Sequence, residues 1–450
     1  MSDTTPDVAP GRLSADAYRE NFSDVQPPLD HGRALVEANR CYFCYDAPCI
    51  EACPTGIDIP SFIHKIATGN LRGAAIDILS ENIMGGSCAR VCPTEVLCQR
   101  ACVREAQEGK PVQIGRLQRY ATDHLMARGV QPFERAEASG KRVAVVGAGP
   151  AGLACAHRLA LLGHAVELFD SRPKAGGLNE FGIAAYKLPD RFAGREADFI
   201  LSIGGITFSR GKTLGRDMTL ADLRHDFDAV FLGLGLGGVR TLGFEGEDLG
   251  GVHNAVDYIA ELRQSDDLSR LPVGRRIVVI GGGNTAIDIA VQTKRLGAED
   301  VTIVYRRGPS AMSATGHEQE FAQVNGVRIR HWARPAGLTT RNGHVCAVEF
   351  EYTQMDESGR LAGIGETYSL PADMVFKAIG QTFVADPVGK GDHSLLDLDG
   401  GRIAVDDDRR TSLPDVWAGG DSVATGDDLT VSAVQDGKLA AHAIDRYLRS

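Results

Sequence analysis

Short apolar segments alternate with longer segments of helical pattern through the last two thirds of the chain. Lys141–Val146 and Arg276–Ile280 are rich in branched aliphatic residues, and each runs into a glycine-rich turn followed by a helix. A second apolar strand follows each helix, at Ala165–Phe169 and at Val301–Tyr305. Strand, helix and strand in this order predict two α/β folds with parallel sheets.

Two later segments complete this pattern. Met374–Gly380 reads as a strand that ends in a glycine, which suits the close approach of a cofactor. Val416–Asp421 reads as a strand whose glycines place Asp421 at its end. A C-terminal helix is expected over about Leu429–Arg449.

The first 140 residues have a different pattern, in which helices predominate. After a flexible lead-in with a short helix over residues 1–30, we expect helices at 31–40, at Ile59–Asn70 and at Leu71–Glu81. A further helix is expected to end near Arg128. Residues 129–140 are polar and carry a proline, which predicts a linker.

Charge and the cysteine count narrow the function. The net charge of −11 argues against a nucleic-acid or anionic-membrane surface, and the most apolar stretch is too short to span a bilayer. No signal peptide is visible over Met1–Pro10, so we expect a cytoplasmic protein. Eight of the ten cysteines fall between Cys41 and Cys102. Such a dense group in a chain without an export signal indicates metal ligation rather than disulfides.

The cysteines form two groups of four, Cys41, Cys44, Cys49 and Cys53, then Cys88, Cys92, Cys98 and Cys102. Cys53 and Cys92 are each followed by proline, and the first group is close to the bacterial ferredoxin pattern. Two groups could hold two 4Fe–4S clusters or two zinc ions. Zinc ribbons favour paired Cys-x2-Cys motifs, of which only Cys41/Cys44 is present, so iron–sulfur is favoured. Spacing alone places Cys88 in the second site.

The two glycine turns predict two dinucleotide sites. Gly147, Gly149 and Gly152 form a G-x-G-x-x-G turn, and the next strand ends in Asp170, which can bond a ribose hydroxyl. Asp421 is expected to contact the ribityl chain of a flavin, with a simple turn acid as the alternative. These features predict FAD in the first fold.

The second turn carries Gly281, Gly283 and Ala286, but its second strand ends in Arg306 and Arg307. Two arginines can hold a ribose 2′-phosphate, which a carboxylate would repel. We therefore expect NADP(H) to be preferred and NAD(H) to be possible. The alternative is that both arginines are merely solvated.

The predicted fold class is an α-helical iron–sulfur domain followed by two α/β Rossmann-like dinucleotide-binding domains, one nested in the other. The helical domain is expected over residues 1–138. The FAD-binding domain is expected over 139–240 and 381–450, and the NAD(P)H-binding domain over 241–380.

Nearly the whole chain resembles the nucleotide-oxidising half of dihydropyrimidine dehydrogenase, which in bacteria is a separate subunit similar to the small subunit of glutamate synthase. The resemblance lies in Cys41–Pro54, 85–94, Ile114–Gln118, Gly147–Gly152 and Gly419–Asp421. It implies one 4Fe–4S cluster on Cys41, Cys44, Cys49 and Cys102. It implies a second on Cys53, Cys92, Cys98 and the side-chain oxygen of Gln118, with Cys88 left as a non-ligand. A neutral amide in place of a thiolate should raise the reduction potential of that cluster.

The same resemblance implies the contacts of the dinucleotides. For FAD it points to Asp170, Leu178, Lys187 and Asp421, where Lys187 replaces the usual arginine and loses a bidentate contact. For the nicotinamide dinucleotide the implied residues are Gly283, Asn284, Thr285, Arg306, Arg307 and the segment from Ala378 to Gly380.

The resemblance implies an oxidoreductase in which cofactors do the chemistry and no general acid or base is needed. Hydride would pass from NAD(P)H to FAD, and single electrons through the two clusters to a partner. That partner is expected to be an FMN- and iron–sulfur-containing subunit, in a hetero-oligomer, that reduces uracil and thymine to 5,6-dihydropyrimidines.

Three alternatives stay open. The small subunit of glutamate synthase has three residues between the cysteines that match Cys92 and Cys98, where this chain has five, and has a glutamate at the position of Gln118. The large subunit of a ferredoxin:NADP oxidoreductase shares the wide spacing but typically carries that glutamate. A non-enzymatic scaffold is disfavoured by the intact glycines and cysteines.

Overall fold

The computed structural model describes residues 7–389 and 396–450, which divide into two compact units. One unit comprises Met1–Val25, Phe181–Pro189 and Gly238–Thr382, and the other comprises Gln26–Glu180, Asp190–Gly237 and Phe383–Ser450. Residues 1–6 and 390–395 lie outside the described residues. The first range belongs to the segment in which we expect no signal peptide, and the second belongs to the expected FAD-binding domain. No helix in the described part of the chain is long and apolar enough to cross a membrane.

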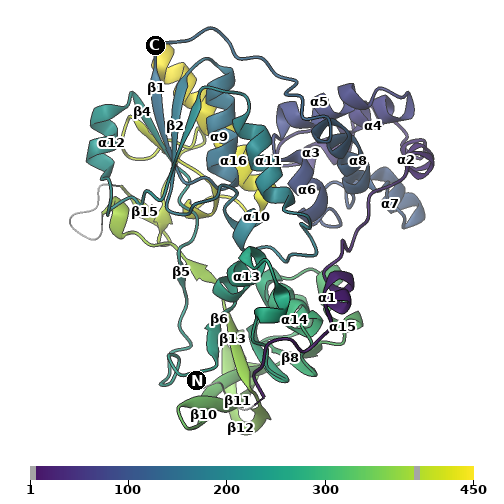
Figure 1. The fold of residues 1–450 in the computed structure, drawn as a ribbon, viewed down its shortest axis with the longest axis vertical. Coiled ribbons are helices and arrows are strands. Elements are labelled where there is room, and N and C mark those ends of the chain that lie inside the picture. The colour runs from purple at the N-terminus through teal and green to yellow at the C-terminus, as the bar shows by residue number, and fades with distance from the viewer. Residues whose placement is uncertain (1–6, 390–395) are drawn as a thin grey trace. The chain divides into compact units, whose positions relative to one another are not determined.

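The larger unit begins with the helices of the cysteine-rich segment (Figure 1). They are α2 (His31–Ala38), α3 (Pro48–Glu51), α4 (Ile59–Ala67), α5 (Leu71–Glu81), α6 (Gly85–Val91), α7 (Val103–Glu108) and α8 (Ile114–Met126). Phe62, Ile78 and Leu117 are fully buried between α4, α5 and α8. The helix expected to reach Asn70 ends at Ala67, because Gly69 takes a left-handed φ of 80° and the Asn70 side chain caps α5.

The same unit contains a five-stranded parallel sheet in the order β17-β4-β1-β2-β3. Its strands are β1 (Arg142–Val146), β2 (Ala165–Asp170), β3 (Ile206–Arg210), β4 (Ala229–Leu232) and β17 (Val416–Ala418). Helix α9 (Pro150–Leu161) connects β1 to β2 and packs against the C-terminal helix α16 (Thr430–Arg449). Gly437 permits this contact, since a Cβ there would stand 2.1 Å from the Ala151 carbonyl oxygen. Other elements are α10 (Leu178–Phe181), α11 (Phe192–Leu201) and α12 (Leu220–Asp226).

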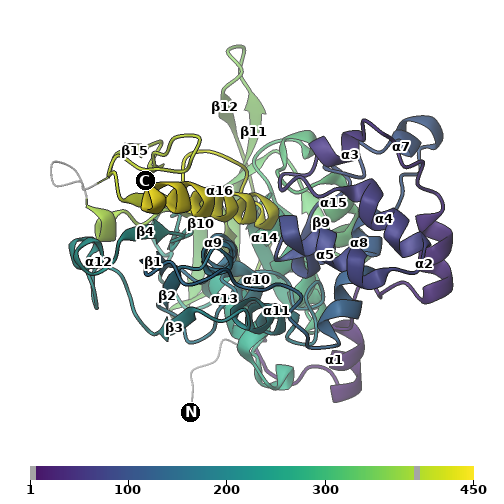
Figure 2. The same ribbon diagram turned by 90° about the horizontal axis from the view of Figure 1, so that it is seen from above.

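The smaller unit contains a second five-stranded parallel sheet, in the order β6-β13-β7-β8-β9. Its strands are β6 (Val252–Asn254), β7 (Arg276–Gly281), β8 (Asp300–Val304), β9 (Arg328–Arg330) and β13 (Met374–Ala378). Along the chain, all of them lie between β4 and β17. Its helices are α13 (Ala255–Gln264), α14 (Asn284–Arg295) and α15 (Gly316–Val324). An antiparallel sheet of β10 (Ala333–Arg341), β11 (His344–Met355) and β12 (Leu361–Pro371) ends in a long hairpin (Figure 2).

The start of the chain differs from the expected division. Residues up to Val25, assigned above to the helical domain, group with the smaller unit, where α1 (Ala15–Asn21) lies. The Arg12 side chain donates to the Val273 carbonyl at 2.9 Å, and the Asn21 side chain donates to the Arg295 carbonyl at 2.8 Å. These bonds join residues far apart in sequence, so no local pattern predicts them.

Candidate cofactor sites

The first set of predicted cluster ligands converges in one place. Cys41, Cys44, Cys49 and Cys102 line a single hollow whose remaining walls are mainly apolar. The loop before α3 supplies the first two, α3 supplies Cys49, and Cys102 immediately precedes α7. Thiol groups from three short segments thus face one space. The 4Fe–4S assignment of this hollow therefore stays a prediction from the number and spacing of the cysteines.

The electrostatics of this hollow fit a positively charged group. Burial, followed by the neighbouring Cys41 and Cys102, raises the pKa of Cys49 to about 12. Burial also raises the pKa of Cys41. Four thiolates in this space would repel one another, and iron ions would supply the compensating charge.

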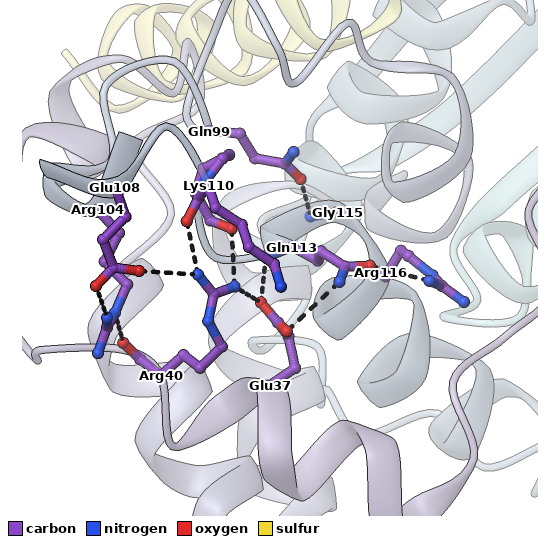
Figure 3. A network of polar contacts seen from close by, with 10 residues as sticks. Glu37, Arg40, Gln99, Arg104, Glu108, Lys110, Gln113, Gly115 and Arg116 are labelled. Atoms are coloured by element: carbon purple, nitrogen blue, oxygen red, sulfur yellow. Dashed lines mark hydrogen bonds and ion pairs between the residues drawn. The ribbon is translucent and has the colours of Figure 1, made fainter. Parts of the chain in front are cut away.

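A polar network, drawn in Figure 3, includes Arg104, which also lines the hollow. Arg40 donates to the Glu37 carboxylate at 2.6 Å and to the carbonyls of Lys110 and Pro111. Arg104 lines the hollow, donates to the Arg40 carbonyl, and lies 4.0 Å from the ring centre of Tyr42. These bonds fix the backbone on both sides of the ligands, and nothing in the local sequence pattern indicated them.

The second set is also close together. Ionised Cys53, Cys88 or Cys98 would each raise the pKa of Cys92, and the largest contribution is a hydrogen bond with Cys88. Burial raises the pKa of Cys98 to about 12, with Cys53 the next contribution. The structure therefore brings Cys53 to the second group, and it leaves Cys88 among the neighbours.

Gln118, on α8, is buried with 8% of its surface exposed. Its side-chain NH2 donates to the Gly85 carbonyl at 2.7 Å. With the nitrogen engaged there, the amide oxygen points away from Gly85 and is available as an acceptor or ligand. This residue is therefore positioned through its side-chain nitrogen, and its role as a ligand through the oxygen stays a prediction.

A buried carboxylate connects α6 to the flavin-type fold within the same unit. Glu196, on α11, accepts from the Ser87 backbone N–H at 2.9 Å and also from the Ser87 hydroxyl. Burial raises the pKa of Glu196 to about 7. Sequence reasoning missed this residue because the partners are more than a hundred positions apart.

The first glycine turn has the tight backbone that a dinucleotide fold requires. Gly147 has a φ of 101°, and a Cβ on it would stand 2.1 Å from the Gly233 carbonyl oxygen. A Cβ on Gly152 would stand 1.8 Å from the Gly147 carbonyl oxygen. Gly149 caps α9, whose first N–H groups have no partner in the helix and can receive a pyrophosphate.

The predicted flavin contacts within this fold lie at strand ends. Asp170 closes β2, accepts from the Ala148 and Arg172 backbone N–H groups at 2.7 Å, and has a pKa raised by burial. Asp421 follows β17, and burial raises its pKa to about 6. Leu178 begins α10 and is 38% exposed. The residues present thus fit a bound dinucleotide.

Lys187 lies in the other unit. Its ammonium is held between the carboxylates of Asp288, at 2.8 Å, and Glu318, at 2.7 Å. Burial alone lowers the pKa of Lys187, but the two carboxylates outweigh it and raise the pKa above its ordinary value. The structure therefore pairs Lys187 with two acids of the smaller unit, and its flavin contact stays a prediction.

The second glycine turn repeats the first. Gly281 has a φ of 147°, and a Cβ on it would stand 2.1 Å from the carbonyl oxygen of Ala378, its partner on β13. Gly283 caps α14, in which Asn284 and Thr285 are the first residues. Gly380 has a φ of 102° and accepts from the Arg240 backbone N–H at 3.2 Å.

Arg306 and Arg307 follow β8 at the carboxyl edge of this sheet. Arg306 is exposed and Arg307 is half-buried. In the described part of the chain neither guanidinium forms an ion pair, so both charges are available to an anion.

Two protein-family models match the chain. Residues 18–130 match "dihydropyrimidine dehydrogenase domain II, 4Fe-4S cluster", and residues 141–437 match "pyridine nucleotide-disulphide oxidoreductase". The chain is 35% identical to the glutamate synthase [NADPH] small chain of Escherichia coli, covering 98% of this chain and 97% of that one. It is 35% identical to the NAD-dependent dihydropyrimidine dehydrogenase subunit PreT of Salmonella typhimurium, covering 96% and 98%.

Solved structures share the fold. FprA of Mycobacterium tuberculosis in complex with NADPH aligns with a TM-score of 0.57 at 20% identity, over 69% of this chain and 85% of that one. Thioredoxin reductase of T. acidophilum aligns with a TM-score of 0.53 at 23% identity, over 69% and 100%.

The expected resemblance and the two kinds of domain are confirmed by these matches. The chain carries a 4Fe–4S domain before a dinucleotide-binding region, and it is an NAD(P)H-dependent oxidoreductase. It belongs to the pyridine nucleotide-disulphide oxidoreductase family, in the branch that includes dihydropyrimidine dehydrogenase and glutamate synthase subunits.

Proposed function

We propose that this chain is the NAD(P)H-oxidising subunit of a dihydropyrimidine dehydrogenase. It binds FAD on the β1–β2 fold, a nicotinamide dinucleotide on the β7–β8 fold, and two 4Fe–4S clusters in the helical segment. Its partner in a hetero-oligomer is an FMN- and iron–sulfur-containing subunit that reduces uracil and thymine. The relatives named as dihydropyrimidine dehydrogenase subunits support this assignment.

Each proposed cofactor has candidate binding residues in the chain. Cys41, Cys44, Cys49 and Cys102 would hold one cluster, and Cys53, Cys92, Cys98 and Gln118 the other. When bound, the flavin accepts a hydride and releases electrons singly, and the clusters carry single electrons. The chain contributes the glycine turns that would admit the dinucleotides, Asp170 and Asp421 at strand ends that would hold the flavin, and the buried walls around the cysteines.

The observation that carries the choice of subunit is the bond from Gln118 to Gly85. A glutamate, expected here in the two alternative families, would turn a carboxylate oxygen toward a carbonyl oxygen, and neither atom could donate. The site is therefore built for an amide. A neutral ligand at the second cluster distinguishes the dihydropyrimidine dehydrogenase type in this comparison.

The small chain of glutamate synthase is the second candidate, because identity does not separate the two. Both relatives are 35% identical over nearly the whole chain. Their names also differ in nucleotide, NADPH for the one and NAD for the other. The two arginines after β8 favour NADPH for this chain.

Reconstitution tests the assignment. The purified chain should contain one FAD and about eight irons, and NADPH should reduce an artificial acceptor without a partner. Uracil should be reduced only after an FMN-containing partner subunit is added. Glutamate formation with a glutamate synthase large subunit, without uracil reduction, would assign the second candidate instead. Uracil turnover by this chain alone would contradict the division of labour.

A variant tests the observation on Gln118. Gln118→Glu removes the donor to Gly85 and adds a negative charge at the second cluster, so its reduction potential should fall. Potentiometric titration followed by electron paramagnetic resonance measures this. Gln99→Glu is the matched control, since Gln99 accepts from the Gly115 backbone through its oxygen, which glutamate retains. Equal potentials in Gln118→Glu and the unmodified chain would remove the amide from the ligand set.

A further inference from the structure

Trp332 occupies an unusual position beside the two arginines. It lies between β9 and β10 and takes a left-handed φ of 60°, which a bulky side chain rarely adopts. Its side chain is nevertheless 38% exposed, so burial of the indole does not explain the strain. Strained residues that persist are held by their surroundings, and they concentrate at binding and catalytic sites.

Two backbone bonds hold Trp332 in this conformation. Its N–H donates to the Arg307 carbonyl at 3.3 Å, and its carbonyl accepts from the Thr353 N–H at 2.9 Å. The buried Thr353 hydroxyl also donates to the Arg306 carbonyl at 2.8 Å. Trp332 and the turn that carries both arginines are therefore fixed to one another through β11.

The indole lies directly against this turn. A Cβ built on Gly308, the residue after Arg307, would stand 2.9 Å from Cζ2 of the Trp332 ring and 3.3 Å from Cε2. Only glycine leaves room for the ring at that distance. Within residues 7–389 and 396–450, no other aromatic ring or guanidinium is stacked on the indole. The ring therefore covers the turn and keeps part of its surface open.

A second aromatic ring lies against the glycine turn that precedes α14. Tyr305 lies over the second glycine turn, because a Cβ on Gly282 would meet its ring. Its hydroxyl donates to the Ala311 carbonyl at 2.6 Å, which fixes the ring. The glycine turn, Tyr305, the arginines and Trp332 thus form one continuous edge of the smaller unit.

We propose that Trp332 is the surface on which the adenine of the nicotinamide dinucleotide stacks. This inference rests on the proposed nucleotide site of the β7–β8 fold. In such folds the residues after the second strand contact the ribose of the adenosine half. A 2′-phosphate held by Arg306 and Arg307 fixes the ribose beside Gly308, and the base attached to that ribose then meets the ring packed on Gly308. Stacking of a base on an indole strengthens binding without selecting a phosphate.

The roles of the arginines and the indole are separable. The arginines should discriminate NADPH from NADH, because only NADPH carries the 2′-phosphate. The indole should serve NADPH, NADH and 2′,5′-ADP alike, because all three carry adenine.

The chain contains a built-in reporter for this contact. It has two tryptophans, and the other, Trp417, is 1% exposed on β17 of the larger unit. Binding of 2′,5′-ADP, which has no nicotinamide, should quench the tryptophan emission of the flavin-loaded protein. The quench should persist in Trp417→Phe and vanish in Trp332→Phe.

Affinity gives the decisive measurement. Trp332→Gly removes the ring and relieves the left-handed backbone, and its FAD content and reduction by saturating NADPH check that the variant is folded. The Kd values for 2′,5′-ADP, NADPH and NADH should each rise about ten-fold or more in this variant. Trp332→Phe should restore them to within about three-fold, because a phenyl ring still offers a face.

The possible results distinguish the stacking role of Trp332 from the existence of the nucleotide site. Unchanged Kd values in Trp332→Gly, with normal binding by the unmodified protein, would overturn the stacking role alone. A rise for NADPH but not for NADH would assign Trp332 to the phosphate and also overturn it. Failure of the unmodified protein to bind 2′,5′-ADP and to have its flavin bleached by NADPH would remove the proposed nucleotide site, and this inference with it.

Discussion

The two dinucleotide folds of this chain share the same tight glycine turn and differ in the residues at the end of the second strand. In both, the first glycine of the turn has a positive φ and faces a carbonyl oxygen 2.1 Å from where a Cβ would stand. β2 ends in Asp170, whose carboxylate accepts from two backbone N–H groups. After β8 come Arg306 and Arg307, whose guanidinium groups have no ion pair among the described residues. We expect the shared part to form a pyrophosphate site and the different part to set which nucleotide binds.

The largest effect should come from substituting the first glycine of each turn separately. Gly147→Ala places a methyl group against the Gly233 carbonyl and should weaken FAD binding roughly 1,000-fold, about 4 kcal/mol. Gly281→Ala meets the Ala378 carbonyl in the same way and should leave FAD bound while abolishing its reduction by NADPH. Flavin absorbance of the purified variants measures the first effect, and anaerobic bleaching measures the second.

Gly316→Ala is the control for both, since a Cβ there has nothing within 4 Å and no positive φ. It should bind FAD and be reduced normally. Loss of FAD from Gly281→Ala would show that the two turns do not act independently.

The next largest effect should come from the two arginines that follow β8, for which the first fold has no counterpart. Arg306→Glu combined with Arg307→Glu replaces two cations with two anions next to the expected 2′-phosphate. The ratio of kcat/KM for NADPH to that for NADH should fall about 100-fold, or about 2.7 kcal/mol. Steady-state reduction of ferricyanide by each nucleotide measures it. An unchanged ratio would mean that the arginines are merely solvated.

The elements of both folds could be predicted from sequence because glycines mark where strands end and helices begin. Strands β1, β2, β7 and β8 lie within a residue or two of the expected ranges, and Gly147 and Gly281 occupy the expected turns. The cysteines could be predicted as ligands because thiols this dense, in a chain without an export signal, indicate metal binding. Spacing could not divide them between two sites, since proximity across loops has no signature in sequence. The family resemblance, and not the spacing, assigned Cys53 to the second group, and in the structure Cys53 lies near Cys98.

What sequence could not provide are contacts between distant segments. Lys187 has a flavin role by resemblance, but it lies between Asp288 and Glu318, about a hundred or more positions away. Glu196 reaches Ser87, and Trp332 reaches Gly308, with no periodic pattern to reveal either contact. Buried polar pairs of this kind depend on tertiary packing, which a single sequence does not display.

A smaller effect should come from the acid that closes β2. Asp170→Asn keeps one oxygen but turns an NH2 group toward one of the two backbone N–H donors, at Ala148 or Arg172. FAD binding should weaken about ten-fold, through the loss of one hydrogen bond to the turn and of the charge near the ribose. Isothermal titration of the flavin-free protein with FAD measures this. Asp217→Asn, at an exposed turn, is a control that should leave the Kd unchanged.

The smallest effect concerns Asp421, at the end of β17, where the second fold has Gly380 and no carboxylate. Burial raises the pKa of Asp421 from 3.8 to about 6, so the folded protein holds this proton more tightly than the unfolded chain does. The stability that this proton contributes is present at low pH and is lost as pH rises through about 6. Between pH 5 and pH 8 the free energy of unfolding should fall by about 1 kcal/mol through this group.

Asp421→Asn cannot ionise, so urea unfolding of the flavin-free variant should lack this decrease. The difference in free energy of unfolding between this variant and the unmodified protein should be larger at pH 8 than at pH 5 by about 1 kcal/mol. Glu196 also titrates near pH 7 and is present in both proteins, so only the difference between them reports on Asp421. If the stability difference between the variant and the unmodified protein does not change with pH, then Asp421 is solvated. The ends of β17 and β13 would then differ only in that one carries a carboxylate.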